Sequence, residues 1–114
     1  MSQTILLLSG DLVARDRLDR AVPGDTILPT TTERLRADLE TRSPDALVVD
    51  LDTNGHELAA IVSIARELGL PSEKIVGYFS HVNEDAQRAA SDAGIAAVTR
   101  GRFWTDPAAH ILGE

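Results

Sequence analysis

The sequence has no cysteine, only one lysine and four aromatic residues among its 114 positions. Without cysteine the chain forms no disulfide, thiolate zinc site or iron–sulfur cluster, and it has no cysteine nucleophile. A formal net charge of −7 argues against nucleic-acid binding, since phosphate contacts need clustered basic residues. No apolar run approaches the roughly 20 residues of a membrane span, and the N-terminus lacks the basic flank of a signal peptide. We therefore expect a small acidic cytoplasmic protein that binds neither nucleic acid nor membrane.

Short apolar runs punctuate the sequence and predict strands. Most are continuous rather than alternating, which is typical of strands buried on both faces of a parallel sheet. A run at 26–28 lies between Pro23-Gly24 and Pro29, which favours a short edge strand. The other predicted strands cover 5–8, 46–49, 75–79 and, more weakly, 96–98.

Apolar residues between these runs recur with helical spacing. Helices are expected around 14–22, 35–39, 58–68 and 86–93, with a last short helix starting at Asp106-Pro107. Asn83 or Ser80 is the expected N-cap of the alanine-rich helix, and Gly94 ends it.

Five strand–helix units in this length predict one α/β domain over residues 1–114. Strands that alternate with helices form a parallel sheet covered on both faces, with right-handed crossovers. The expected architecture is the (βα)5 flavodoxin-like, doubly wound domain, with a five-stranded sheet of order 2-1-3-4-5.

Ligands and reactions in such sheets gather at the carboxyl ends of the strands. Asp11, Asp50, Ser80 and Arg100 follow four of the predicted strands, so the topology places them around one shallow crevice. Without any resemblance, Asp50 would be a strand-end carboxylate that accepts backbone N–H groups from its loop.

The ordered set of motifs resembles the receiver domain of two-component response regulators. Residues 44–51, PDALVVDL, look like the receiver's third strand, which would make Asp50 the phosphoacceptor. Ser80 falls where receivers keep the Thr or Ser that senses phosphorylation. Ala93-Gly94, a short strand and then Phe103 are similar to the receiver's final segment. The resemblance implies a receiver-like fold over essentially the whole chain.

Two departures from the receiver pattern affect its chemistry. Receivers end their first strand with two acidic residues that hold Mg²⁺, where this chain has Ser9 and Gly10, and only Asp11 offers a nearby carboxylate. The receiver lysine is also missing. Counting back from Phe103 places Arg100 at its position, whereas counting forward from Gly94 places Gly101 there.

These departures predict a degenerate receiver, or pseudo-receiver, that is not an enzyme and is a stand-alone signalling module. It would act through a protein partner, a signalling component or histidine kinase, or through self-association, without normal phosphorylation and without a cofactor. One alternative is a working receiver phosphorylated on Asp50 with Mg²⁺, in which Ser80 and Arg100 bind the phosphoryl group. Another is a small-ligand-binding flavodoxin-like domain.

Arg102, Phe103 and Trp104 form the candidate interaction surface. By resemblance, this segment belongs to the face of the fourth helix, fifth strand and fifth helix, through which receivers commonly bind partners. Trp and Arg are frequent binding hot spots. Phe103 by itself suits the core. Hydrolase chemistry is not expected, because adjacent strand residues such as Ser80 and His81 would point to opposite faces. No metal site is expected, since the histidines lack ligand spacing.

Overall fold

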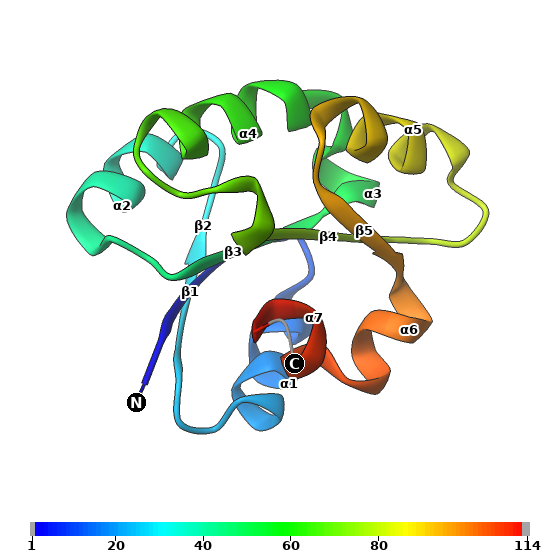
Figure 1. Cartoon of the computed structure of the whole chain (residues 1–114). Coiled ribbons are helices and arrows are strands. Elements are labelled where there is room, and N and C mark those ends of the chain that lie inside the picture. Colours follow the sequence, from blue (N-terminus) through cyan, green and yellow to red (C-terminus); the bar gives the residue numbers. More distant parts are fainter. Residues whose placement is uncertain (1, 113–114) are drawn as a thin grey trace.

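A computed structural model describes residues 2–112, which form one five-stranded parallel sheet with helices on both faces (Figure 1). The strand order is β2-β1-β3-β4-β5, as the sequence predicts. Each predicted strand is present: β1 (Thr4–Leu8), β2 (Thr26–Thr30), β3 (Ala46–Asp50), β4 (Ile75–Phe79) and β5 (Ala96–Thr99). Pro29 lies within β2, which the sheet tolerates because β2 is at its edge.

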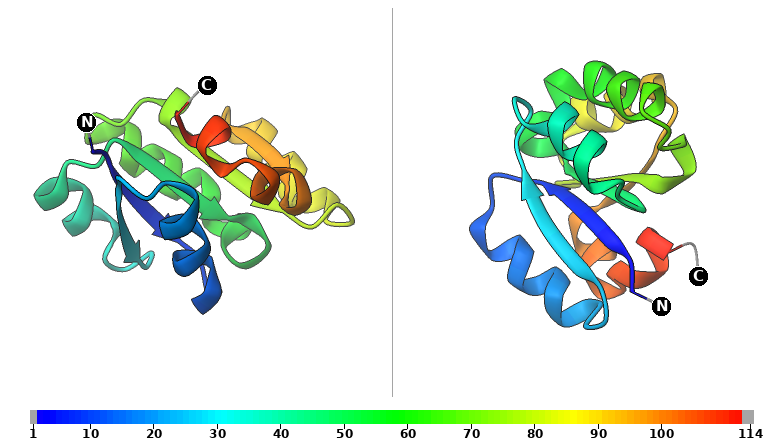
Figure 2. Two further views of the ribbon diagram at one scale, coloured as in Figure 1. Left: turned by 90° about the horizontal axis from the view of Figure 1, so that it is seen from below. Right: turned by 90° about the vertical axis from the view of Figure 1, so that its left-hand side faces the viewer.

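Two helical layers enclose the sheet (Figures 1 and 2). One face packs against α1 (Leu12–Ala21), α6 (Arg100–Thr105) and α7 (Pro107–Leu112). The other packs against α2 (Leu35–Arg42), α4 (Leu58–Glu67) and α5 (Glu84–Ala93). Figure 2 shows β1 and β2 lying between these layers. Because both faces of the sheet are covered, the central strands are apolar along their length.

The predicted helix ends are confirmed in detail at α5. The Asn83 side chain accepts a hydrogen bond from the Ala86 N–H at 3.1 Å, so Asn83 rather than Ser80 is the N-cap. Gly94 ends the helix with φ = 76°, a conformation that glycine adopts without strain. The small side chains of Ala86 and Ala90 are buried against the sheet, so the alanine stripe is core packing.

Three features of the chain differ from the sequence expectation. The segment after β3 forms a short helix, α3 (Leu51–Asn54), which leads into a 3-10 turn, η1 (Gly55–Glu57); a second such turn is η2 (Ser72–Lys74). The segment after β5 forms the helix α6, which was not predicted from the sequence. Ser80 and His81 lie in the loop after β4, so strand alternation is the wrong reason to separate them; within residues 2–112, no hydrogen bond joins the two.

Throughout residues 2–112, every helix is too short or too polar to span a bilayer.

Candidate functional site

Asp50 is the last residue of β3 and is one of the two buried polar side chains among the described residues, with 2% of its surface exposed. Its Oδ1 accepts a hydrogen bond from the Asp52 N–H at 3.1 Å, which caps α3. Its Oδ2 accepts one from the Ser9 hydroxyl at 3.2 Å. Asp50 is thus a strand-end carboxylate that accepts a backbone N–H, as one interpretation of the sequence expected, but the N–H belongs to the short helix α3 rather than to a loop.

Arg100 supplies the positive charge at this carboxylate. One guanidinium nitrogen lies 3.3 Å from Asp50 Oδ1 and 2.8 Å from Asp52 Oδ2. The guanidinium also lies over the Tyr78 ring, 4.9 Å from its centre. Hydrogen bonding to Asp52 raises the pKa of Arg100 above its ordinary value, so Arg100 is a permanent cation. Arg100, rather than Gly101, is therefore the residue that brings a cation to Asp50.

Asp52 also follows β3, and the sequence did not predict that its carboxylate would link the neighbouring strand ends. Its carboxylate accepts hydrogen bonds from Arg100, from the Ser80 N–H at 2.9 Å and from Asn83 Nδ2 at 2.8 Å. Partial burial raises the pKa of Asp52, but the bonds from Arg100, Asn83 and Ser80 outweigh it and the pKa lies below its ordinary value. The available signal was the Asp50-x-Asp52 spacing at the end of a buried strand. Through Asp52, the ends of β3, β4 and β5 are tied together.

Ser9 and Tyr78 connect the site to the core. The Ser9 hydroxyl donates to Asp50, and it accepts from the Tyr78 hydroxyl at 3.2 Å and from the Asp11 N–H at 3.0 Å. Burial of Tyr78, together with the charge of Asp50, raises the pKa of Tyr78 to about 12. The phenol therefore stays protonated and acts as a donor. Tyr78 lies opposite Asp50 in the pairing of β3 with β4. The sequence alone could not predict this neighbour, because it depends on the register of the two strands.

Asp11 and Ser80 lie at the same edge of the sheet without touching Asp50 in the described contacts. The Asp11 carboxylate caps α1 by accepting the Val13 N–H at 2.9 Å. Ser80 contributes its backbone N–H to Asp52 and lines a groove beside Arg100. The sequence thus identified the correct end of the strands, and Arg100 contacts Asp50 there; the other side-chain partner of Asp50 is Ser9 rather than Asp11 or Ser80.

The residues at this edge do not fit a Mg²⁺ ion. Both Asp50 oxygens accept hydrogen bonds from the chain, and the Arg100 cation lies against Oδ1. Asp11 is engaged as a helix cap, and Ser9 provides a hydroxyl where receivers have a carboxylate. Among the described residues, no three His, Asp or Glu side chains are grouped as metal ligands. Mg²⁺ needs a nearly octahedral set of oxygen ligands, which this arrangement does not present.

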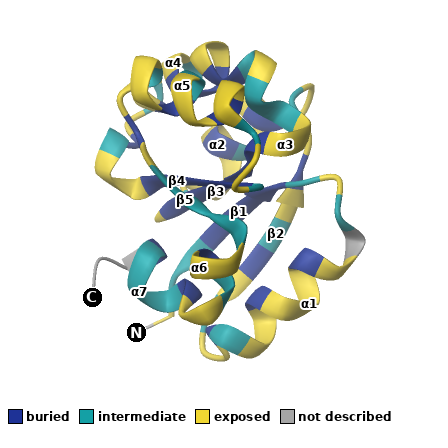
Figure 3. Cartoon of the chain, turned by 90° about the vertical axis from the view of Figure 1, so that its right-hand side faces the viewer, coloured by how far each residue is buried: buried dark blue, intermediate teal, exposed yellow. Residues whose placement is uncertain are grey.

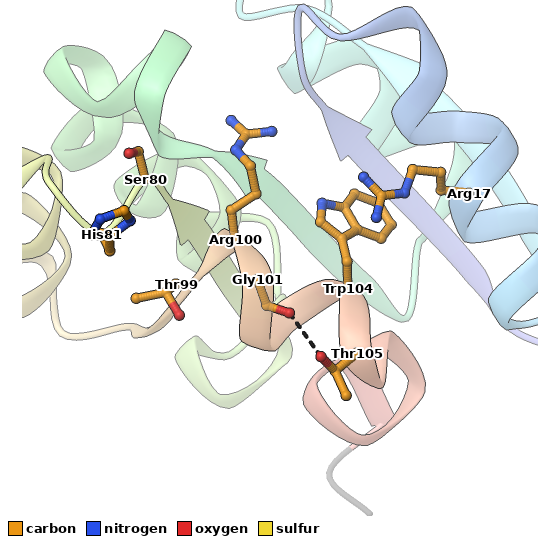
Figure 4. Close-up of a pocket in the computed structure, with 8 residues that line it drawn as sticks. All are labelled: Arg17, Ser80, His81, Thr99, Arg100, Gly101, Trp104 and Thr105. Atoms are coloured by element: carbon orange, nitrogen blue, oxygen red, sulfur yellow. Dashed lines mark hydrogen bonds between the residues drawn. The ribbon is translucent and has the colours of Figure 1, made fainter.

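A groove of about 620 Å³ opens beside Arg100, between the loop after β4, α6 and α1 (Figure 4). Trp104 forms part of its wall and is half-buried, with the Arg17 guanidinium 4.2 Å from the ring centre. Arg17 was not anticipated from the sequence because it lies in a helix whose charges alternate in sign.

The proposed surface of Arg102, Phe103 and Trp104 needs one correction. Phe103 is fully buried and stacks on Tyr78 with ring centres 5.0 Å apart, so it belongs to the core. Arg102 is exposed and Trp104 is half-buried. Figure 3 shows that α6 carries both exposed and buried residues. The cation beside Trp104 is Arg17 rather than its sequence neighbour Arg102.

Comparison with known proteins identifies the fold through structure. No family model matches the sequence, and no curated protein is significantly similar to it. Among solved structures, a CheY-like protein (tadZ) from Pseudomonas aeruginosa PAO1 has a TM-score of 0.73 at 21% identity, over 97% of this chain and 98% of that one. A response regulator from Thermotoga maritima has a TM-score of 0.75 at 14% identity, over 98% and 99%.

A putative CpaE2 pilus assembly protein from Sinorhizobium meliloti 1021 is also similar, with a TM-score of 0.63 at 16% identity over 96% of this chain and 97% of that one. The matches extend over nearly the full length of each pair of chains. The chain therefore has the CheY-like, flavodoxin-like fold of response-regulator receivers, as the sequence resemblance predicts.

Proposed function

We propose that this chain is a cytoplasmic, non-enzymatic module of two-component-type signalling, which acts through protein–protein interaction without normal phosphorylation of Asp50. The receiver fold and the position of Asp50 at the end of β3 support the link to two-component signalling. The surroundings of Asp50 support the departure from receiver chemistry.

The observation that carries the proposal is the ion pair of Arg100 with Asp50 and Asp52. Transfer of a phosphoryl group to a carboxylate depends on positioning the group and on neutralising its charge, usually with a metal ion. Here the carboxylate oxygens of Asp50 are held by Ser9, Asp52 and Arg100. An incoming phosphoryl group must displace these bonds and would find no acidic pair to hold Mg²⁺ beside it.

The same contacts suit a fixed structural role for the site. They join the carboxyl ends of three neighbouring strands through charge-assisted hydrogen bonds, which are stronger than neutral ones. The loops at the carboxyl ends of these strands are therefore held in one arrangement without phosphorylation. A rigid edge next to the half-exposed Trp104 favours recognition of a partner rather than turnover of a substrate.

The test is incubation with acetyl phosphate and MgCl₂, followed by intact-mass measurement of the wild type and of Asp50→Asn. We expect no phosphate-sized gain in mass in either protein, while a receiver that has the acidic pair and the lysine gains it under the same conditions. A gain in the wild type that Asp50→Asn lacks would overturn the proposal and establish the working receiver instead.

Native mass spectrometry of the purified chain tests the remaining alternative. A small molecule that copurifies in stoichiometric amount, and is lost on substitution of a groove residue, would favour a ligand-binding domain over an interaction module. We expect the chain to carry no such molecule.

A further inference from the structure

The groove beside Arg100 is lined by two arginines and, among the described residues, by no carboxylate, on a protein whose net charge is −7. Arg17 and Arg100 both line it, on opposite sides of the Trp104 ring (Figure 4). Arg100 is already paired with two carboxylates. Arg17 stacks on the Trp104 ring at 4.2 Å, and within residues 2–112 no carboxylate lies within 4.0 Å of its guanidinium. The donors of Arg17 are thus positioned by the ring and available to an acceptor.

Besides Arg17, the groove holds another hydrogen-bond donor without a described partner, the indole N–H of Trp104. The indole Nε1 is buried and has no hydrogen-bond partner among residues 2–112. Figure 4 shows this nitrogen on the side of the ring that faces Arg100. A buried donor without a partner costs about 1–3 kcal/mol. A small shift of the half-buried ring on binding would offer this N–H to an acceptor, which favours a ligand with oxygen acceptors.

The stacked pair of Arg17 and Trp104 separates two hollows. Both residues line the groove of about 620 Å³ and also a neighbouring hollow of about 500 Å³, whose lining includes Arg20 and one carboxylate, that of Asp106. In the described structure Arg20 has no carboxylate partner within 4.0 Å, and its Nε donates only to the Asp16 carbonyl. A ligand that uses both hollows must cross the stacked pair. An extended segment fits this shape better than a compact small molecule.

We propose that the Arg17–Trp104 pair is the docking point for an extended acidic segment of a partner protein. One carboxylate pairs with Arg17, and the segment lies across the ring from the Arg100 side to the Arg20 side. This inference deepens the proposed function and rests on it, since it names the chemistry of the partner. Opposite charge would also speed the encounter, because the groove attracts acidic segments that the rest of the chain repels.

Trp104 is the only tryptophan in the chain, so its fluorescence reports on this site alone. The probe is an N-acetylated hexaglutamate amide, titrated into the full chain at constant ionic strength, with hexaglutamine as the neutral control. We expect a saturable change in Trp104 emission with hexaglutamate and none with hexaglutamine. Isothermal titration calorimetry provides an affinity that does not depend on the ring's environment.

Two arginine variants separate the groove from general charge. Arg17→Ala should weaken hexaglutamate binding roughly tenfold, the loss expected for one charge-assisted hydrogen bond. Arg42→Ala removes the same charge from an exposed position on α2, across the sheet, and should bind as the wild type does. Arg17→Lys should lie between the two, because lysine keeps the charge but loses the planar stack.

Several results would overturn the inference. These are a lack of saturable binding, an equal loss in Arg17→Ala and Arg42→Ala, or full competition by inorganic phosphate at similar concentration, which would make the groove a site for small anions. None of them bears on the acetyl phosphate experiment. A failure of the docking inference is thus distinguishable from a failure of the proposed function, which only a gain in mass on Asp50 reveals.

Discussion

Replacing Arg100 by alanine removes the positive charge at a buried carboxylate. The Asp50 side chain is 3% exposed, whereas the Arg100 side chain is 35% exposed. The substitution leaves Asp50 in place with two hydrogen bonds, from the Ser9 hydroxyl and the Asp52 N–H. It also removes one of the bonds to the Asp52 carboxylate.

The expected cost follows from how much of the pair is buried. Removing one partner of a fully buried ion pair typically costs about 3–5 kcal/mol, whereas an exposed pair contributes at most about 1 kcal/mol. Because Arg100 is one third exposed and Asp50 keeps two donors, the loss should lie between these ranges, at about 2 kcal/mol. That is a large share of the stability of a domain of this size, about 5–15 kcal/mol.

Urea denaturation followed by Trp104 fluorescence and by circular dichroism measures the free energy of unfolding. The loss should arise mainly from the uncompensated charge, so Arg100→Ala in an Asp50→Asn background should cost about 1 kcal/mol less than in the wild type. Arg100→Lys should recover part of the loss. The reasoning is refuted if Arg100→Ala costs less than about 0.5 kcal/mol, or if its cost is equal in both backgrounds.

Two further predictions concern packing and pH. A Cβ at Gly77 would lie 2.6 Å from Leu51 Cδ1 in the core, so Gly77→Ala should lower the free energy of unfolding by about 1–3 kcal/mol. Gly24→Ala, which meets nothing within 4 Å, is the control and should be nearly neutral; equal losses would contradict the packing argument. Folding lowers the pKa of Asp52 from its ordinary value of 3.8. The ionised carboxylate therefore stabilises the folded protein fully above pH 3.8, and this stabilisation is lost as the pH falls through the lower, folded-state pKa. The stability difference between the wild type and Asp52→Asn should therefore shrink in strong acid, and a difference that stays constant would refute this role.

The site shows where sequence reasoning succeeded and where it ended. Asp50 and Arg100 were predicted because each directly follows a strand of a parallel sheet, and strand ends of this fold converge. The roles of Asp52 and Arg17 were not predicted because they depend on partners far away in the sequence. Asp52 binds Ser80 and Asn83, and Arg17 lies against Trp104.

The sequence by itself determined the architecture, because apolar periodicity, glycine and proline positions and helix caps are local signals that agree with one another along the chain. It also determined what the site lacks: the acidic pair and the lysine. Only the tertiary structure decided what replaces them. Whether Arg100 or Gly101 meets Asp50, and whether Phe103 or Trp104 faces outward, depends on the turn of α6 after β5. In that short helix Phe103 packs against Tyr78, a contact between residues 25 positions apart.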